Sequence, residues 1–270
     1  MSTNKACGID NLPSKLLKHS APVISKPLSF LVNLSLKTGS FPQKWKTAKI
    51  TPLHKSGDTT NTDNYRPISV LPTLSKILER EIHRQIMTYL ETHSLLSRNQ
   101  FGYRSKRSTQ LATTLFLDNI RFEINKGKLV GALFIDLSKA FDTIGHSILL
   151  NKLPASGIIN KELMWFENYL FNRKHIVQYD ETISEPQDIY CGVPQGSILG
   201  PLLFMLYFND IEDVVLHSES IMFADDTVLY ASGKNQHELE EKLSKDLHCI
   251  YEYLQENDLI LNTKKGKLKQ

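Results

Sequence analysis

Two adjacent aspartates, Asp225 and Asp226, stand in the middle of the apolar stretch Ile221–Tyr230 and limit how this part of the chain can fold. An unpaired charge inside a protein is very costly, so a buried strand cannot run straight through two neighbouring carboxylates. The pair is therefore predicted to lie at a turn, with Met222–Ala224 and Val228–Tyr230 as the two arms of a hairpin. Because side chains alternate across a strand, one carboxylate can point into a site while the other supports it.

Two carboxylates held this close repel each other, and one would stay protonated unless a cation lay between them. Hard divalent cations take oxygen ligands, so Mg²⁺ is the natural occupant of such a site. The same residues also fit a simpler structure, an Asp-Asp hairpin turn on a solvated surface. On these residues alone both interpretations stay open.

The overall composition excludes little. The length of 270 residues permits one large domain or two smaller ones with a sizeable core. Apolar residues make up 41% and charged residues 23%, which is ordinary for a soluble globular protein. The net charge of +3 and the pI near 8.6 permit a nucleic-acid partner without requiring one, so the distribution of charge is more informative than its total.

Cysteine usage and hydropathy indicate an intracellular protein without a membrane partner. The three cysteines, Cys7, Cys191 and Cys249, show neither metal-ligand spacing nor a disulfide framework, which favours a reducing compartment. Whether that compartment is the nucleus or the cytoplasm stays open. Met1–Asp10 is polar and is no signal peptide, and the apolar run Ile198–Phe208 is about half the ~20 residues that span a bilayer.

Apolar residues recur at helical spacing in several segments. Between residues 8 and 38 they predict core-facing helices that begin near Pro13, Pro22 and Pro27. Further helices are expected over residues 71–90, 111–124, 161–171, 202–208 and 236–255, and strands over residues 176–179 and 188–191. Apolar and polar residues alternate over Trp45–Lys55, which predicts a strand. A functional role for its lysines and a solvated edge strand, in which lysines discourage aggregation, fit this segment equally well.

The most basic window of the chain is Ser97–Thr109, where aromatic residues and a glycine lie between cations. Cations neutralise phosphates and aromatic rings stack on bases, so this pattern is typical of a track for single-stranded nucleic acid. The residues of this predicted template-binding track are Arg98, Phe101, Tyr103, Arg104, Lys106 and Arg107. A charge run of this kind also fits a solvated face.

A buried strand, Leu129–Asp136, ends in a single aspartate. A carboxylate at the end of a buried strand is where a metal ligand would lie, but Asp136 could instead cap a helix expected through residues 137–142. Arg66 precedes Pro67 and is held extended, which suits an arginine that grips a phosphate. Gly196 precedes an apolar helix and would let a ligand approach the backbone, although an ordinary helix-entry turn looks the same.

Five of these segments, taken in order, resemble the reverse transcriptase domain of non-long-terminal-repeat retrotransposons of the jockey-like kind. The matching segments are Asn64–Ser69, Gln100–Tyr103, Phe134–Asp142, Gly192–Ser197 and Phe223–Asp226. The resemblance implies an α+β right-hand polymerase with palm and fingers, whose antiparallel palm sheet is backed by helices and whose thumb is missing. It further implies an N-terminal extension over 1–45, fingers over 46–128 and a palm over 129–270 with an insertion at about 145–187, all in one reverse transcriptase domain.

The resemblance also implies roles for individual residues. Two Mg²⁺ ions would be held by Asp136, Asp225 and Asp226, with an RNA template, a DNA primer and deoxynucleoside triphosphates as partners. Phe141 would close over the sugar and exclude a 2′-hydroxyl. The remaining assignments are Lys55 and Arg66 at the triphosphate, Gln195 and Gly196 against the incoming nucleotide and template, and Lys264 or Lys265 as a possible proton donor to pyrophosphate.

The sequence departs from the family pattern in places. Gly145 replaces an acidic residue or asparagine before His146, Gly266 replaces a threonine, and Pro154 falls where a helix is expected to continue. Because the family would supply an endonuclease before this chain and a thumb after it, we expect a fragment whose other regions are encoded elsewhere or lost. A catalytically inactive nucleic-acid-binding remnant is therefore the alternative function. An RNA-dependent RNA polymerase on the same palm is a third, which Phe141 argues against.

Overall fold

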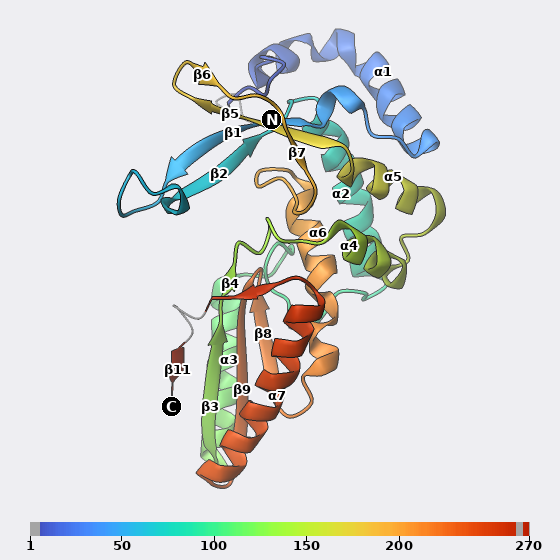
Figure 1. Ribbon diagram of the computed structural model, residues 1–270. Helices are drawn as coiled ribbons and strands as arrows, with labels where there is room; N and C mark the ends of the chain where they lie inside the picture. Colours follow the sequence, from blue (N-terminus) through green and yellow to red (C-terminus); the bar gives the residue numbers. More distant parts are fainter. Residues whose placement is uncertain (1–5, 263–266, 270) are drawn as a thin grey trace. The chain divides into compact units, whose positions relative to one another are not determined.

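The computed structural model describes residues 6–262 and 267–269, and the chain forms two compact units. The first unit comprises Met1–Tyr89 and His146–Gly200, and the second comprises Leu90–Gly145 and Pro201–Gln270. Each unit is therefore built from two separate stretches of the chain. Residues 90–128, expected in the fingers, group with the second unit. Figure 1 labels the elements of both units.

A sheet with β1 at its centre organises the first unit. β1 (Thr47–His54) pairs antiparallel with β2 (Tyr65–Val70) and parallel with β5 (Arg173–Tyr179). β5 also pairs with two short strands, β6 (Thr182–Ile183) and β7 (Gln187–Ile189). Because β1 has a partner on both sides, its interpretation as a solvated edge strand is wrong.

Helices and a cluster of aromatic rings complete the first unit. Its helical segments are α1 (Ser14–Thr38), η1 (Gln43–Trp45), η2 (Thr62–Asn64), α2 (Ser75–Thr92, which continues into the second unit), α4 (His146–Lys152), η3 (Leu153–Ser156) and α5 (Asn160–Leu170). Phe41 packs edge-on against Trp165 and Tyr169 of α5, with ring centroids 5.6 and 5.1 Å away. Trp165 and Tyr169 stack on each other at 5.3 Å. These buried rings supply much of the apolar core of the unit.

α1 differs from its prediction in two respects. It is one helix of 25 residues, and Pro22 and Pro27 lie inside it, so neither marks a helix start. Its apolar residues do not all face the core, since Val23 is 80% and Phe30 67% exposed. The helix packs against α5 along one side only, which leaves the other side in solvent. Amphipathic spacing alone could not say how much of the helix would be covered.

A four-stranded antiparallel sheet, in the order β11-β3-β9-β8, organises the second unit. Its strands are β3 (Leu129–Ile135), β8 (Glu219–Phe223), β9 (Asp226–Gly233) and β11 (Lys267–Lys269), and a separate ladder joins β4 (Leu137–Ser138) to β10 (Ile260–Leu261). Its helical segments are α3 (Thr109–Asn125), α6 (Leu199–Phe208, which begins in the first unit), η4 (Asn209–Val214) and α7 (Gln236–Glu256). The hairpin predicted around the two aspartates is confirmed as β8 and β9.

α3 and α7 cover opposite faces of this sheet. Phe116 of α3 packs edge-on against Tyr230 of β9 at 5.3 Å between centroids, and Ala132 of β3 belongs to the same apolar cluster. On the other face, a β-carbon built at Gly131 would lie 3.1 Å from a methyl group of Leu243 in α7. The alternation along β3 thus sends successive residues to different helices, as the period of a strand requires.

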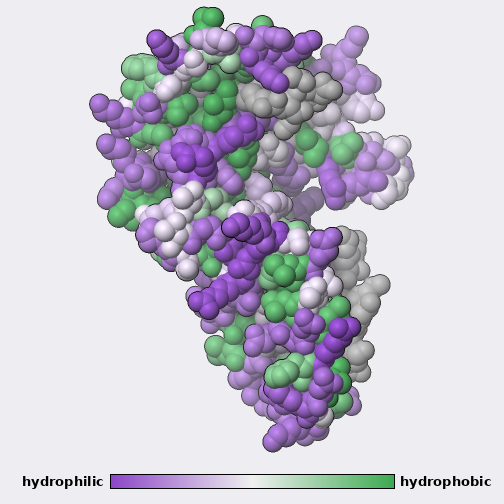
Figure 2. Space-filling model, turned by 180° about the vertical axis from the view of Figure 1, so that it is seen from behind, coloured by the Kyte–Doolittle hydropathy of each residue, from purple (hydrophilic) through white to green (hydrophobic). Residues whose placement is uncertain are grey.

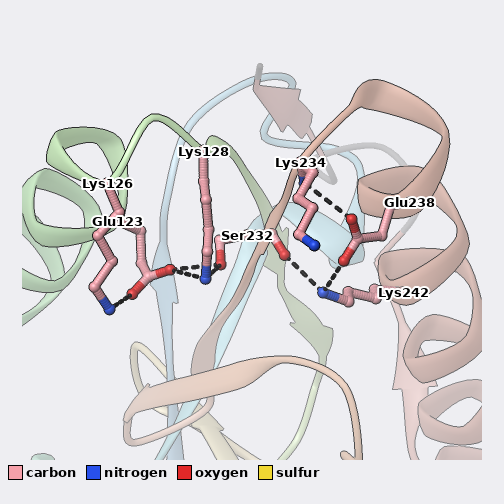
Figure 3. A network of polar contacts seen from close by, with 7 residues as sticks. All are labelled: Glu123, Lys126, Lys128, Ser232, Lys234, Glu238 and Lys242. Carbon is pink, nitrogen blue, oxygen red and sulfur yellow. Dashed lines mark hydrogen bonds and ion pairs between the residues drawn. The ribbon is translucent and has the colours of Figure 1, made fainter.

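A network of polar contacts ties α3, β9 and α7 together at the end of the sheet away from the two aspartates (Figure 3). Glu123, near the end of α3, accepts hydrogen bonds from Lys126, Lys128 and the Ser232 hydroxyl at 2.6–2.8 Å. On the other side of β9, Lys242 of α7 donates to the Ser232 carbonyl oxygen at 2.9 Å. Three cationic or hydroxyl donors on one carboxylate lower the pKa of Glu123 to about 2.

Two predictions about local structure are wrong. No helix follows Asp136, because β4 and a turn that begins at Lys139 (φ 53°) occupy residues 137–142. Pro154 does not interrupt a helix either, since α4 ends at Lys152 and Pro154 lies in the first turn of η3. A proline at that position loses no helical hydrogen bond.

Figure 2 shows one face of the molecule, where apolar residues are exposed in small groups among hydrophilic ones. Scattered surface exposure of this kind is usual for folded proteins. Among the described residues, no helix is both long enough and apolar enough to cross a membrane.

Candidate functional site

The aspartate pair lies at the tight turn between β8 and β9. Phe223 pairs with Asp226, so Ala224 and Asp225 form a two-residue loop. Ala224 has φ 60° and is 6% exposed, whereas Asp225 is not in the left-handed region. Positive φ at the first loop residue alone is the pattern of a type II′ hairpin, which normally has glycine there. An alanine in this conformation is strained by roughly 1–2 kcal/mol, so the surroundings must hold it.

The side chain of Gln100 holds this strained turn. Its Oε1 accepts hydrogen bonds from the backbone N–H groups of Ala224 at 3.0 Å and of Gly102 at 2.8 Å. Its Nε2 donates to the Ala224 carbonyl oxygen at 3.3 Å. Gln100 is 4% exposed, so water cannot replace these contacts freely. Sequence reasoning gave Gln100 no role, because a glutamine 124 residues away from the turn leaves no local signal.

Because Gly102 has no side chain, its backbone can lie in close contact with the same turn. A β-carbon built on Gly102 would lie 2.2 Å from the Ala224 nitrogen, far inside a van der Waals contact. The approach is fixed by a single parallel β-bridge between Gln100 and Met222, in which the Phe101 N–H donates to the Met222 carbonyl oxygen at 2.7 Å and the Met222 N–H donates to that of Asn99 at 2.9 Å. Residues 99–102 therefore brace the turn from the edge of β8.

The sheet register brings Asp136 next to Asp226. Ile135, the last residue of β3, pairs with Thr227 of β9, so Asp136 directly follows the end of β3, beside the start of β9, where Asp226 is the first residue. Asp136 accepts a hydrogen bond from the Asn262 side-chain amide at 2.6 Å. The alternative role of Asp136 as a helix cap is wrong, because no helix follows it.

These carboxylates suit a hard divalent cation in their chemistry, since carboxylate oxygens are the ligands that Mg²⁺ prefers. Two come from neighbouring strands and the third, Asp225, from the turn between β8 and β9. Within residues 6–262 and 267–269, no three His, Cys, Asp or Glu side chains lie together closely enough to form a complete metal-binding group. The donor set therefore fits a metal, and a bound ion would have to draw the carboxylates together.

One aromatic ring, Tyr103, lies near Asp225, and a second, Phe141, packs against it. Tyr103 and Phe141 meet edge-on with centroids 6.4 Å apart, and Phe141 packs against Phe204 of α6 at 5.0 Å. The pKa of Tyr103 is raised, first by partial burial and then by the negative charge of Asp225. Tyr103 is 46% exposed and Phe141 is half-buried, so both side chains are partly accessible to solvent.

Two residues of the predicted basic track have side chains that are buried within the protein. The Phe101 ring is 3% exposed in the apolar cluster of the second unit and cannot stack on a base, so that prediction is wrong. The Arg104 side chain is 7% exposed and pairs with Glu91 at 2.7 Å. Arg107 lies over the Phe101 ring at 4.8 Å. Arg98 and Lys106 are exposed and remain available to a ligand.

The residues predicted to bind the triphosphate lie in the first unit. Lys55 donates its backbone N–H to the Asn64 carbonyl oxygen at 2.8 Å, which extends the ladder between β1 and β2 by one step. Arg66 of β2 pairs with Leu53 of β1. Because opposite residues share a face and residues two apart do too, Lys55 and Arg66 stand on the same face of this hairpin. Both are exposed, and β2 confirms the extended backbone predicted for Arg66.

Gln195 and Gly196 also belong to the first unit, in a loop that leads into α6. The Ser69 N–H donates to the Gln195 carbonyl oxygen at 2.8 Å. Gly196 has φ 118°, and a β-carbon there would lie 2.6 Å from the Ser69 carbonyl oxygen. Glycine is thus required for both its conformation and its close contact with β2. Lys264 and Lys265 lie outside the described residues, as does Gly266.

Known proteins resemble this chain over most of its length. Residues 53–270 match the family described as reverse transcriptase (RNA-dependent DNA polymerase). The chain is 29% identical to the probable RNA-directed DNA polymerase from transposon X-element of Drosophila melanogaster, over 98% of this chain and 30% of that protein. It is 32% identical to the RNA-directed DNA polymerase from mobile element jockey of the same fly, over 97% of this chain and 29% of that protein. The chain therefore spans less than a third of the length of these relatives.

Solved structures with a similar fold include telomerase from Candida tropicalis. Its complex with a fragment of telomeric RNA superposes with a TM-score of 0.63 at 13% identity, covering 91% of this chain and 44% of that chain. The apo form gives a TM-score of 0.62 over 92% of this chain and 49% of that chain. At such low identity the likeness shows the right-hand polymerase fold alone. The family match and the sequence relatives together establish that this chain belongs to the reverse transcriptase family and is a reverse transcriptase domain of the non-long-terminal-repeat retrotransposon type.

Proposed function

We propose that this domain copies RNA into DNA by transferring nucleotides from deoxynucleoside triphosphates to the 3′-hydroxyl of a DNA primer. The observation that carries the proposal is the β8–β9 turn, which the side chain of Gln100 holds in a strained conformation. Asp225 lies in its loop, and Asp226 begins β9 beside the end of β3, which Asp136 follows. Strain that the surroundings maintain is typical of functional sites. A solvated hairpin turn would need neither a buried glutamine nor a backbone packed against it.

In the proposed reaction the primer 3′-hydroxyl gives up its proton to water and its oxygen forms a bond to the α-phosphorus, while the bond from that phosphorus to the bridging oxygen of pyrophosphate breaks. Asp136, Asp225 and Asp226 would hold two Mg²⁺ ions, in keeping with the general metal dependence of the family. When bound, two such ions would supply activation of the primer hydroxyl and neutralisation of the charge on the leaving pyrophosphate. The carboxylates themselves would supply the negative charge that binds the ions and would fix where the ions lie on the protein.

Other side chains would select and hold the substrates. Lys55 and Arg66, exposed on one face of the β1–β2 hairpin, would pair with the triphosphate. The Lys55 ammonium group would act as a flexible point charge, and the planar Arg66 guanidinium could bind two phosphate oxygens at once. Phe141 is packed between Tyr103 and Phe204, so its ring cannot easily move aside for a 2′-hydroxyl. Arg98 and Lys106 would contact template phosphates. The RNA template and DNA primer are in this view the partners of the domain.

The proposal is tested by primer extension on an RNA template with the four deoxynucleoside triphosphates and Mg²⁺. Asp225→Asn should abolish extension, because it removes a charge at the metal site while keeping the size of the side chain. Asp180→Asn is a matched control, since Asp180 lies in the two-residue loop between β5 and β6. Extension that survives Asp225→Asn would refute the proposed site.

The same assay separates the alternative functions. RNA binding by the folded wild-type domain without any nucleotide incorporation would identify an inactive nucleic-acid-binding remnant. Preferential incorporation of ribonucleotides would identify an RNA polymerase instead. One argument for an inactive remnant no longer holds, because Pro154 disrupts no helix.

A further inference from the structure

The loop that carries Gln195 and Gly196 is fixed at three points by other elements of the first unit. At its start, the His146 ring donates from Nε2 to the Gly192 carbonyl oxygen at 2.8 Å. In the middle, Gln195 is bound to β2 as described above. At its end, the Ile198 N–H donates to Oε2 of Glu79 in α2 at 2.7 Å. A loop with three such anchors has little conformational freedom.

Two of the three anchors are buried side chains. Glu79 is 0% exposed and His146 is 3% exposed. A carboxylate removed from water is costly unless its charge is compensated. Glu79 receives compensation from the Ile198 N–H at the start of α6, where backbone amides and the helix dipole favour a negative charge. Arg173 of β5 adds a buried positive charge nearby, which acts against the rise that burial causes in the pKa of Glu79.

Arg173 is itself almost fully buried, at 1% exposure. It donates from Nη1 to the Tyr169 carbonyl oxygen at 3.0 Å, and its guanidinium lies 4.8 Å from the centroid of the Tyr169 ring. Within the described part of the chain, its Nε and Nη2 and the Nδ1 of His146 have no hydrogen-bond partner. Buried polar groups left unpaired reduce stability, so this cluster is not the best arrangement for packing alone.

From this arrangement we infer that Glu79 and His146 are positioning residues, which hold the Gly192–Ile198 loop in the conformation that the incoming nucleotide requires. The buried positive charge of Arg173 supports the Glu79 carboxylate in this role. The inference rests on the proposed function. Neither Glu79 nor His146 touches the substrate in this account. They act by fixing the backbone of Gln195 and Gly196, so that a nucleotide meets a formed loop and need not order it on binding.

The test compares Glu79→Ala and Glu79→Gln with Glu81→Ala as a control. Glu81 is on the same helix but lies at the surface, where it pairs with Arg84. The alanine at position 79 removes the acceptor of the Ile198 N–H, whereas glutamine keeps an acceptor oxygen. Removing the acceptor leaves the part-buried Ile198 N–H without its partner, which corresponds to about a factor of ten in loop ordering. We therefore expect Glu79→Ala to raise the KM for deoxynucleotides about tenfold and to change kcat less than threefold.

Hydrogen exchange provides a readout that needs no activity. In Glu79→Ala the Ile198 amide should exchange at least tenfold faster, Glu79→Gln should restore both the exchange rate and the KM, and Glu81→Ala should alter neither. Should Glu79→Ala fail to fold, His146→Phe tests the other anchor, because it keeps a buried ring but cannot donate to Gly192. A folded variant at either anchor with unchanged loop exchange and unchanged KM overturns the inference. A wild-type domain that never extends a primer contradicts the proposed function, whereas unchanged exchange in Glu79→Ala contradicts the anchor.

Discussion

Replacing Gln100 with alanine removes the side chain that holds the turn carrying Asp225. The substitution breaks three hydrogen bonds, two from backbone N–H groups and one to the Ala224 carbonyl oxygen. A neutral hydrogen bond contributes about 1 kcal/mol net, and each buried N–H left without a partner costs about 1–3 kcal/mol. Ala224 also retains its unfavourable left-handed conformation. We expect the turn to lose about 2–4 kcal/mol of stability relative to other local conformations.

This loss should appear in catalysis more than in substrate binding. Every 1.4 kcal/mol changes a population ratio by about tenfold, so a loss of about 2–4 kcal/mol lowers the ratio of the held turn to other conformations by about 30-fold or more. In primer extension on an RNA template, Gln100→Ala should therefore lower kcat, by up to about 30-fold for a loss of about 2 kcal/mol. Gln100→Glu keeps the acceptor oxygen but loses the amide donor, and it should fall between alanine and the wild type.

The measurement combines steady-state primer extension with denaturant unfolding. Gln110→Ala is the matched control, because Gln110 is an exposed glutamine on the neighbouring helix α3. It should change neither the rate nor the unfolding midpoint. A Gln100→Ala protein with wild-type kcat and wild-type stability would refute the argument that this glutamine maintains the turn.

Three further predictions follow from the second unit. Gly102→Ala places a β-carbon against the Ala224 backbone, so it should cost about 1–3 kcal/mol in denaturant unfolding and lower the extension rate as Gln100→Ala does. Phe141→Ala should relax discrimination against ribonucleotides in single-nucleotide incorporation, and unchanged selectivity would show that the ring does not touch the sugar. The pKa of Glu123 is lowered to about 2, so its contacts stabilise the fold above pH 4.5 and are lost as the pH falls toward 2. Glu123→Gln should therefore make the stability measured by thermal unfolding depend less on pH in this range. An unchanged pH dependence would contradict the role given to these contacts.

Local sequence patterns predicted the β8–β9 hairpin and most helices because the information lies within one element. Two adjacent carboxylates in an apolar run exclude a continuous buried strand whatever the rest of the chain does. Leu129–Ile135 is a strand for a similar reason, since its apolar, partly β-branched run leaves few alternatives. In these cases the local and tertiary preferences agree.

Predictions failed where distant parts of the chain decide. The residues after Asp136 were expected to be helical, but Leu137 and Ser138 pair with β10, more than a hundred residues further along. Phe101 looked like a base-stacking residue because its neighbours are basic, yet Phe101 is buried against the sheet. Burial depends on which elements meet, and residue spacing within one segment cannot reveal it.

The site itself was predicted only in part. The aspartates can be recognised because carboxylates in apolar strands are unusual, but the roles of Gln100, Asn262 and Glu79 depend on contacts across the fold. Each of these residues is polar, and each contacts a segment more than a hundred residues away. A single sequence contains no local signal for such contacts.

The central claim is that Asp136, Asp225 and Asp226 hold divalent ions, and the most direct test is to locate such ions. Crystals of the domain with an RNA–DNA template–primer and Mn²⁺ in place of Mg²⁺ would reveal the metal by its anomalous scattering. We predict peaks within coordination distance of Asp136 and Asp225, and their loss in crystals of Asp225→Asn. Ordered template–primer with no peak beside these carboxylates, or with metal bound elsewhere, would contradict the account.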